Sequence, residues 1–397
     1  MSSFKAGIFK KQLAYKPRIS PRLERGLVAA SDSAAFKSFL PNPINGMVLE
    51  LEDRKIFPLV EEAGNLLGKL NAYSSLFPDI NFFIQMHVIK EATTSSFIEG
   101  TKTNINEALL TKEEINPEKR DDWQEVQNYI KAINFSIAEL NKLPLSMRLA
   151  RNAHEILLSG VRGKYKTPGE IRKSQNWIGG NSLQNATFIP PHQDDLAVLL
   201  TDLEKYWHNE GTKSPFLIKV AISHYQFETI HPFLDGNGRI GRLLIILQLI
   251  EHSLLQKPTL YLSEYFEKYR VEYFDSLSRV RLKNDLEQWL NFFLNGVVET
   301  SKNGIKTLDK IIKLQKDSQE KISNLGRRAR LGESLLKILY ITPIVNVNKI
   351  VKELNVTFPT ANAIIADFEK IGIFKEVTGY DRNRLFSFVD YIDLFKS

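Results

Sequence analysis

Apolar side chains recur at helical spacing along most of the first 300 residues. One example has apolar residues at positions i, i+3, i+4 and i+7: Ile218, Ala221, Ile222 and Tyr225. Residues with this spacing share one face of a helix. Ser214 would supply the N-cap and Pro215 a first-turn proline, so the pattern predicts a helix that begins at about Pro215.

A second apolar helix follows after a short polar interruption. Its apolar face is formed by Ile240, Leu243, Leu244 and Leu247. The stretch that joins the two helices, HPFLDGNGRIGR (231–242), contains a histidine, an acid, three glycines and two arginines. Packing alone does not require this mixture, so the turn is the first candidate for chemistry.

Two regions depart from the helical pattern. Residues 176–191 have short β-prone pieces on either side of a loop rich in Gly, Asn and Ser, which predicts a β-hairpin. Residues 334–397 show two helical segments and then two extended segments joined by a turn from Gly379 to Asn383. This order resembles a winged helix-turn-helix domain. The expected fold is therefore mainly α, with a small β-hairpin flap and a C-terminal winged helix-turn-helix domain.

Composition indicates a soluble globular protein, with 43% hydrophobic and 25% charged residues. The chain contains no cysteine, which excludes disulfides, a thiolate nucleophile and a Cys-based zinc site. The first 20 residues lack the apolar core of a secretory signal. The longest apolar run, 243–250, is far shorter than the roughly 20 residues of a membrane span. We therefore expect a cytoplasmic protein without a membrane partner.

The net charge of +7 is concentrated in residues 301–330, where nine Lys/Arg stand against three acids. A solvated helix face is one interpretation, and a surface that meets an acidic protein or nucleic acid is the other. Apolar residues among these charges predict a partly exposed linking helix.

The glycines of 231–242 do not form the dinucleotide-binding pattern, although Gly236, Gly238 and Gly241 have its G-x-G-x-x-G spacing. That motif follows a strand in a βαβ unit, whereas a helix is expected here. Gly236, Asn237 and Gly238 can instead point consecutive backbone N–H groups at one position at a helix N-terminus, which predicts an anion-binding site. Arg239 and Arg242 share a helix face and can bind a polyphosphate.

Two further residues of the stretch add catalytic chemistry. Asp235 is a hard oxygen ligand that suits Mg²⁺ bridging phosphate oxygens. His231 exchanges protons near neutral pH and is the natural acceptor for the proton of an attacking hydroxyl. Each residue alone has a structural interpretation, such as a turn or a surface arginine. Their occurrence within twelve residues predicts phosphoryl or nucleotidyl transfer.

The same twelve residues resemble the Fic-family signature, HPF-x-[DE]-GN-G-R-x-x-R, and match it at every defined position. Residues 166–196 are similar to the family's β-hairpin flap, and residues 40–110 look like the N-terminal region of a bacterial Fic subgroup. The resemblance implies a helical Fic-type core that moves AMP from ATP onto a hydroxyl side chain of a target protein. It also implies that His231 is the base, that Asp235 binds Mg²⁺ and that the remaining motif residues bind the triphosphate.

The resemblance extends to residues outside the motif. The flap would hold the target segment through Trp177, Ile178, Gly179, Thr187, Phe188 and Ile189. Residues 261–277 are similar to the segment that lines the nucleotide in relatives, with Tyr269 and Tyr273 as candidates. An aromatic stripe at helical spacing is equally compatible with core packing. Phe274 stands where many relatives have a second tyrosine.

The stretch SSFIEG (95–100) resembles the Fic inhibitory motif, [ST]-x-x-x-E-[GN]. Ser95 and Glu99 are four residues apart on an expected helix that ends at Gly100. The alternative is a capped surface helix. In an inhibitory role, the Glu99 carboxylate would pair with Arg242 in place of a γ-phosphate. The enzyme without its activator should therefore be nearly inactive.

Four parts are therefore expected. These are an N-terminal helical region (1–115) with an inhibitory helix at about 82–100, a Fic catalytic core (116–300), a linker helix (301–333) and a winged-helix domain (334–397). The expected reaction is AMP transfer, with self-modification included. The same site could instead remove AMP from modified proteins.

A DNA-binding regulator with a secondary catalytic core is the alternative from another class. Residues 334–397 contain eight Lys/Arg and seven acids, whereas a DNA-reading domain usually has a basic surface. Arg382 and Arg384 on the wing could contact phosphates. Protein docking or dimerisation is favoured for this part, so a homo-oligomer is an expected partner and DNA binding stays open.

Overall fold

The computed structural model describes residues 4–12, 36–49, 53–76, 80–160, 162–211 and 214–396. The predicted N-terminal region, 1–115, and the first 20 residues considered for a secretory signal therefore lie partly outside the described residues. The chain forms two compact units, each assembled from three separate segments. The first unit comprises residues 1–60, 138–248 and 271–293, and the second comprises residues 61–137, 249–270 and 294–397.

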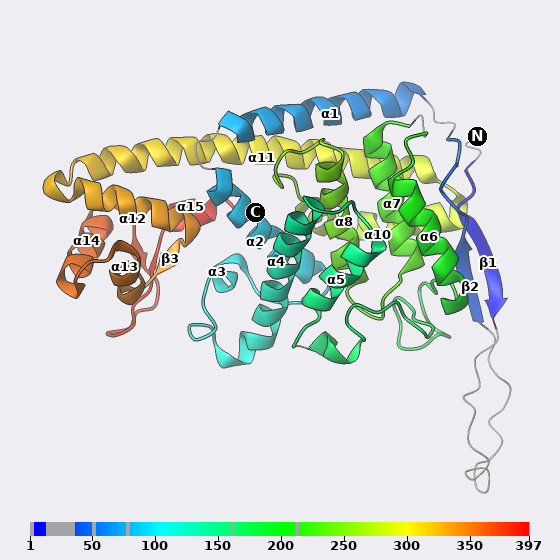
Figure 1. Cartoon of the computed structure of the whole chain (residues 1–397), viewed down its shortest axis with the longest axis horizontal. Helices are drawn as coiled ribbons and strands as arrows, with labels where there is room; N and C mark the ends of the chain where they lie inside the picture. The colour runs from blue at the N-terminus through cyan, green and yellow to red at the C-terminus, as the bar shows by residue number, and fades with distance from the viewer. Residues whose placement is uncertain are drawn as a thin grey trace, which may run out of the picture. The chain divides into compact units, whose positions relative to one another are not determined.

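Helices dominate both units, as predicted (Figure 1). The elements with most of their residues in the first unit are β1 (Gly7–Gln12), β2 (Phe36–Pro41), α5 (Met147–Leu157), η2 (Arg162–Tyr165), η3 (Gln193–Asp195), α6 (Leu196–Trp207), α7 (Phe216–Ile230), α8 (Asn237–Glu251) and α10 (Arg270–Lys283). Those of the second unit are α1 (Asp53–Leu76), α2 (Ile80–Ile98), α3 (Ile105–Ala108), η1 (Pro117–Lys119), α4 (Arg120–Leu140), α9 (Ser263–Lys268), α11 (Leu286–Ser323), η4 (Gly326–Arg328), α12 (Ala329–Ile341), β3 (Ile344–Val345), α13 (Val347–Leu354), α14 (Phe358–Lys370), β4 (Lys375–Glu376), β5 (Phe386–Ser387) and α15 (Val389–Asp393).

Helix α7 forms the centre of the first unit, because every residue from Leu217 to Ile230 is buried. A helix that is buried all round belongs to a core rather than to a surface. Trp289 donates its indole N–H to the Ala221 carbonyl oxygen at 2.8 Å, and Trp207 donates to the Ser223 hydroxyl at 2.7 Å. The predicted N-cap was wrong: Pro215 occupies that position and Ser214 lies outside the helix, so no side-chain bond caps α7.

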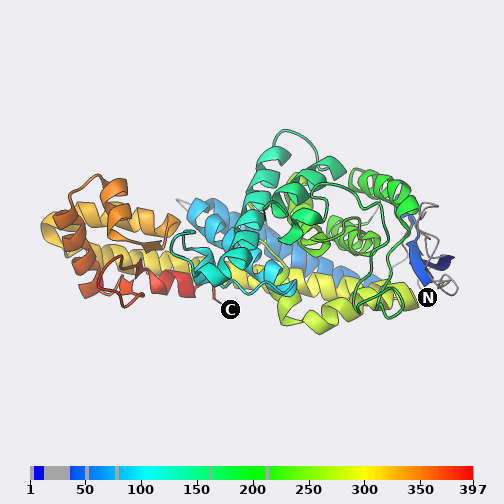
Figure 2. The same cartoon turned by 90° about the horizontal axis from the view of Figure 1, so that it is seen from below.

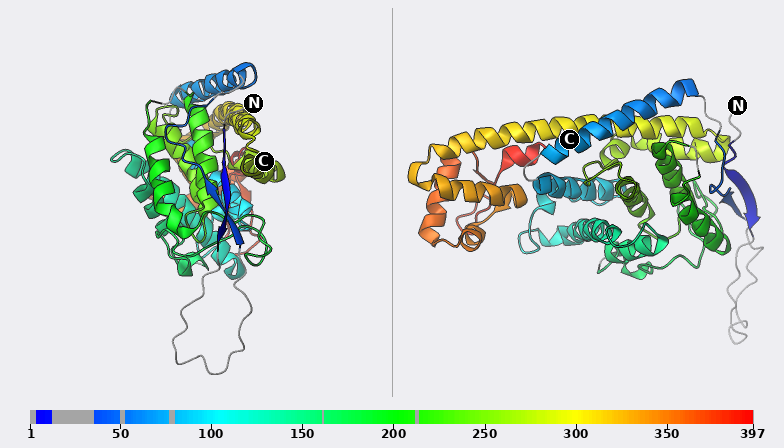
Figure 3. Two further views of the ribbon diagram at one scale, coloured as in Figure 1. Left: turned by 90° about the vertical axis from the view of Figure 1, so that its right-hand side faces the viewer. Right: turned by 45° about the horizontal axis from the view of Figure 1, so that its top comes forward.

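An N-terminal hairpin was not predicted from the sequence. Strands β1 and β2 pair antiparallel, with Phe9 opposite Phe39 (Figure 3). Most of β1 is exposed on both faces, so the strand lacks the apolar and polar alternation that would have revealed it. The predicted hairpin at 176–191 is present as a single antiparallel bridge between Ile178 and Phe188. The Phe39 N–H donates to the Ile189 carbonyl oxygen at 2.9 Å and so joins the two hairpins.

The C-terminal segment of the second unit contains the two helices and two strands that were predicted for it. Helices α13 and α14 pack together and precede strands β4 and β5 (Figure 2). The structure adds α12 and the short strand β3, which completes an antiparallel sheet with the order β3, β5, β4. The expected linker helix at 301–333 is largely the second part of α11, which continues from Leu286 to Ser323 without a proline.

The C-terminal segment packs on α2 within the second unit. The Tyr391 hydroxyl donates to the Phe82 carbonyl oxygen at 3.2 Å, and the Phe82 ring stacks on Tyr340 with centroids 5.6 Å apart. The Phe395 ring meets the edge of His87 at 5.3 Å. Aromatic pairs at these separations contribute beyond the area that they bury. The first turns of α2 are therefore anchored by the last residues of the sequence.

Within the described ranges, no helix combines the length and the apolar character needed to cross a membrane.

Candidate functional site

His231 lies at the C-cap of α7 in a left-handed backbone conformation, with φ 51° and ψ 61°. Such a conformation is uncommon for residues other than glycine and is found where the surrounding structure enforces it. The ring atom Nδ1 lies 3.3 Å from the Glu228 carbonyl oxygen. Because a carbonyl only accepts hydrogen bonds, Nδ1 carries the proton and Nε2 is the nitrogen that can receive one.

Arg172 and Asn176 hold the chain around His231. The Arg172 guanidinium donates to the carbonyl oxygens of His231 at 3.0 Å and Pro191 at 2.6 Å. Its burial, at 2% exposure, lowers the pKa of Arg172 to about 10. Asn176 donates to the Phe233 carbonyl oxygen at 2.9 Å. These buried bonds to backbone oxygens fix the turn on which the histidine stands.

The predicted anion-binding turn is fixed by the Asn237 side chain. Its amide oxygen accepts from the Phe233 N–H at 2.8 Å, and its amide nitrogen donates to the Phe233 carbonyl oxygen at 2.9 Å. Gly236 has φ 75°, a conformation that favours glycine. The Gly236 N–H donates to the Asp235 carboxylate at 2.6 Å. The turn thus already presents a backbone N–H to a negatively charged oxygen at the start of α8.

The two motif arginines are buried, each with 4% exposure. Surface arginines that only solvate a helix face would be exposed, so this interpretation does not hold for Arg239 and Arg242. An Arg239 guanidinium nitrogen lies 3.8 Å from the Asp235 carboxylate. Buried guanidinium groups at the start of α8 place positive charge where a polyphosphate would need it.

Asp235 is suited to bind Mg²⁺ together with the phosphates of a bound substrate. Its carboxylate is 46% exposed beside the turn. No cluster of three or more His, Cys, Asp and Glu side chains that could hold a metal occurs among the described residues. Mg²⁺ commonly uses one or two carboxylates together with substrate phosphates and waters, and a single half-exposed aspartate meets that need.

The flap residues differ in exposure. Trp177 is 40% exposed and Thr187 is exposed, whereas Phe188 is buried beneath the Arg281 guanidinium, 3.9 Å from its ring centroid. Ile178 and Ile189 are half-buried. Gly179 has φ 69°, and a Cβ atom there would lie 2.3 Å from the Thr187 hydroxyl, so only glycine fits this close approach. Phe188 is thus the buried anchor of the flap, and Trp177 and Thr187 form its exposed edge.

The two candidate nucleotide tyrosines have different surroundings. Tyr273 belongs to the first unit and is 1% exposed, and its hydroxyl bonds to His224 Nε2 at 2.8 Å. Tyr269 belongs to the second unit, where its ring lies 4.7 Å from the Tyr265 ring and beneath the Lys268 ammonium group. Phe274 is 43% exposed. This geometry gives Tyr273 a core contact, and a role with the nucleotide remains a prediction for both tyrosines.

Ser95 and Glu99 lie at the end of α2 in the second unit. Ser95 is fully buried. Glu99 follows the last helical residue, and Gly100 has φ 98°, which agrees with the predicted end of the helix. The Arg270 guanidinium donates to the Ile98 carbonyl oxygen at 2.8 Å. A cation at a helix C-terminus stabilises it, so the backbone that carries Glu99 is held in place.

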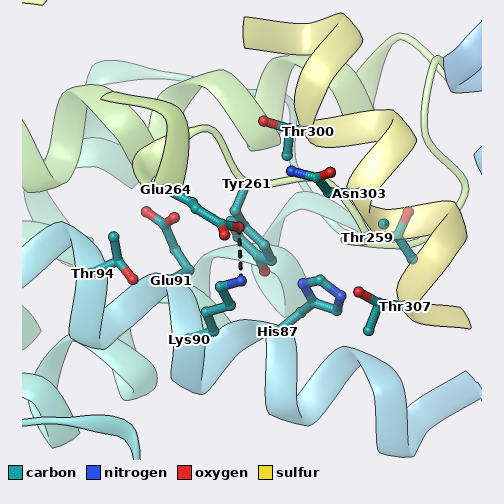
Figure 4. Close-up of a pocket in the computed structure, with 11 residues that line it drawn as sticks. His87, Lys90, Glu91, Thr94, Thr259, Tyr261, Glu264, Thr300, Asn303 and Thr307 are labelled. Atoms are coloured by element: carbon teal, nitrogen blue, oxygen red, sulfur yellow. Dashed lines mark ion pairs between the residues drawn. The ribbon is translucent and has the colours of Figure 1, made fainter. Parts of the chain in front are cut away.

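Figure 4 shows a polar cavity beside α2 within the second unit. Lys90 and Glu264, which line it, form an ion pair at 2.7 Å. The buried Glu91 carboxylate accepts from the Ser263 hydroxyl at 2.6 Å. The cavity has a volume of about 30 Å³, which is room for about one water molecule. It is too small for a nucleotide.

His154, Arg172 and Asn176 are supporting residues that sequence reasoning missed. His154 lies on the apolar face of α5, together with Leu149, Ala153 and Leu157. It is fully buried and stacks on Phe233, with ring centroids 3.8 Å apart. A polar residue at an apolar position of an amphipathic helix was the available signal. No sequence pattern marked Arg172 or Asn176 as supporting residues.

Comparison with known proteins defines the class. Residues 57–138 match the Fic/DOC family N-terminal region, and residues 144–249 match the Fic/DOC family. The chain therefore contains a Fic/DOC N-terminal region and a Fic/DOC domain.

Several relatives carry an activity in their names. The chain is 28% identical over 238 residues to the protein adenylyltransferase Fic of Drosophila virilis, a match that covers 56% of this chain and 46% of that protein. The protein of the same name from Drosophila grimshawi is 30% identical over 223 residues, covering 55% and 43%. The chain thus spans less than half the length of these relatives.

Two solved structures share the fold. A Fic family protein from Desulfovibrio desulfuricans G20 has a TM-score of 0.53 at 20% identity, over 84% of this chain and 95% of that chain. A Fic domain containing signaling protein from Bacteroides thetaiotaomicron VPI-5482 has a TM-score of 0.53 at 18% identity, over 62% and 97%. At these identities the likeness concerns the fold alone.

Proposed function

We propose that this protein is an adenylyltransferase that moves AMP from ATP onto a Tyr, Thr or Ser hydroxyl of a target protein. The observation that carries the proposal is the joint placement of His231, the Gly236 N–H and two buried arginines around one turn between α7 and α8. The relatives named protein adenylyltransferase Fic support it. The target protein would lie against the exposed edge of the flap.

In the proposed reaction, His231 Nε2 takes the proton of the target hydroxyl as its oxygen attacks the α-phosphorus of ATP. A new oxygen–phosphorus bond forms, the bond between the α-phosphorus and its bridging oxygen breaks, and pyrophosphate leaves. The Glu228 carbonyl oxygen, by accepting from Nδ1, keeps the imidazole in the tautomer that this step needs. The amide turn and the arginines would bind the phosphate charge.

Asp235 would hold Mg²⁺ next to the phosphates, where the ion would neutralise the charge of the leaving pyrophosphate.

We also propose that Glu99 restrains the reaction and that the restraint acts on nucleotide binding. The resemblance of residues 95–100 to the inhibitory motif supports this role, as does the firm placement of the end of α2 by Arg270. A carboxylate that pairs with an arginine of the phosphate site competes with a γ-phosphate for the same charge. Glu99 could also serve a site that removes AMP.

The test uses purified wild type, Glu99→Gly and Glu99→Gly/His231→Asn with Mg²⁺ and α-labelled ATP. We expect label on protein and an AMP-sized mass shift, strongest in the single variant and absent from the double variant. Equal labelling by wild type and Glu99→Gly would reject the brake. Release of AMP from a pre-modified target, without transfer, would reverse the proposed direction.

Partners and location are part of the same proposal. We expect a cytoplasmic protein that modifies itself as well as its target and that forms a homo-oligomer. The C-terminal segment has the element order of a winged helix-turn-helix domain, and its near-neutral charge supports protein docking over DNA binding. Salt-dependent binding of random duplex DNA by the full chain would reverse this preference.

A further inference from the structure

We infer that His154 is a positioning residue that aims the Gly236 N–H at the incoming phosphate. The inference rests on the proposed function, because it names the residue that prepares its phosphate site. His154 lies outside the 231–242 motif, on α5, and forms a hydrogen bond with the Asp235 carbonyl oxygen of the turn.

The two ring nitrogens of His154 have distinct partners. Nδ1 accepts from the Gly169 N–H at 2.9 Å, and Nε2 lies 2.9 Å from the Asp235 carbonyl oxygen. Since Nδ1 is an acceptor and a carbonyl oxygen cannot donate, Nε2 carries the proton and donates to Asp235.

The bond from Nε2 sets the direction of one peptide group. In a trans peptide, the carbonyl oxygen of one residue and the N–H of the next point to opposite sides of the chain. The described residues contain no cis peptide bond, so holding the Asp235 carbonyl oxygen toward His154 sends the Gly236 N–H to the opposite side. There it meets the Asp235 carboxylate at 2.6 Å.

The ring also fixes the position of the turn by contact. It lies nearly parallel to the Phe233 ring, at an interplanar angle of 10°. A Cβ atom on Gly236 would lie 3.4 Å from His154 Cδ2 and 3.6 Å from His154 Nε2, so the glycine lies close to this side of the imidazole. His154 thus links the phosphate turn to Gly169, which has φ 77° and lies three residues before Arg172.

Three substitutions separate the hydrogen bonds from the packing. His154→Gln keeps a donor at about the position of Nε2, His154→Asn keeps only the acceptor near Nδ1, and His154→Phe keeps the stacking and loses both bonds. The probes are ATP and inorganic triphosphate, with dissociation constants measured by calorimetry. We expect the Asn and Phe variants to bind both probes roughly five- to tenfold more weakly and the Gln variant to stay within about twofold of wild type.

A matched control removes the same kind of bond elsewhere in the first unit. His208 Nε2 donates to the Leu145 carbonyl oxygen at 2.8 Å, away from the motif. His208→Asn should leave triphosphate binding unchanged. Thermal melting of all variants identifies any that fail to fold. If the Phe variant does not fold, the comparison of the Asn and Gln variants still tests the inference.

The outcomes distinguish this inference from the proposed function. Triphosphate binding that is unchanged in the Asn and Phe variants, or a Gln variant as weak as the Phe variant, overturns the role of His154. If wild type binds triphosphate but neither binds ATP nor transfers AMP, the proposed function is wrong. Triphosphate binding by the His154 variants then still tests the role of His154. If neither wild type nor Glu99→Gly binds either probe, both are wrong.

Discussion

At the scale of single residues, the backbone of His231 matters as much as its ring. A left-handed conformation costs an ordinary L-residue about 1–2 kcal/mol, whereas asparagine tolerates it better. His231→Ala and His231→Asn should both abolish AMP transfer. The Ala variant should be less stable than the Asn variant by about 1 kcal/mol, as measured by urea unfolding. Equal stability would mean that the φ of 51° stores no strain.

The Asp235 carboxylate occupies the amide turn, and this leads to a second prediction for a single residue. Its carboxylate accepts from the very N–H that a phosphate would use. In buffer with a chelator, Asp235→Asn should bind inorganic triphosphate roughly three- to tenfold more tightly than wild type, because a competing negative charge is gone. With excess Mg²⁺ the order should reverse. If wild type binds triphosphate more tightly than Asp235→Asn in both buffers, the Asp235 carboxylate does not compete with a phosphate for the turn.

At the scale of elements, Gly241 allows α8 to approach α7 closely. A Cβ atom there would lie 2.1 Å from the Glu228 carboxylate and 3.1 Å from the Phe227 ring. Gly241→Ala should therefore lower the free energy of unfolding by about 1–3 kcal/mol. Gly68→Ala in the exposed face of α1 is the matched control, since nothing lies within 4 Å of its Cβ position. It should raise stability by up to about 1 kcal/mol.

Sequence reasoning succeeded where the signal was local. The 231–242 turn and its flanking helices are set by residues within a few positions of one another, and Gly179 and Asn185 mark the flap hairpin in the same way. His154 and Arg172 act on this turn from about 60 to 80 positions away in the chain, so no periodicity could reveal them. Strand β1 escaped because its residues are exposed on both faces.

At the scale of the whole molecule, buried histidines make stability depend on pH. Burial lowers the pKa of His87 to about 3, of His154 to about 4 and of His224 to about 3, from an ordinary value of 6.5. Between pH 6.5 and about 4 the unfolded chain therefore binds protons that the folded chain does not. The stabilisation is complete above pH 6.5 and is lost as the pH falls through this window.

The contribution of one histidine can be measured by difference. Urea unfolding of wild type and His224→Gln from pH 8 to pH 5 should show a shallower pH slope for the variant, by up to one proton. Carboxylates titrate in both proteins and cancel in the comparison. Parallel slopes would mean that His224 is protonated in the folded state, which would contradict the lowering of its pKa by burial.

The interleaving of the two units along the chain has a consequence for the gene. The polypeptide passes from one unit to the other after residues 60, 137, 248, 270 and 293. A single recombination point in the gene therefore cannot separate the two units, because every cut between these segments divides at least one of them. Shuffling can add or remove sequence at the outer ends, but the catalytic turn and the helix that carries Glu99 are expected to be inherited together.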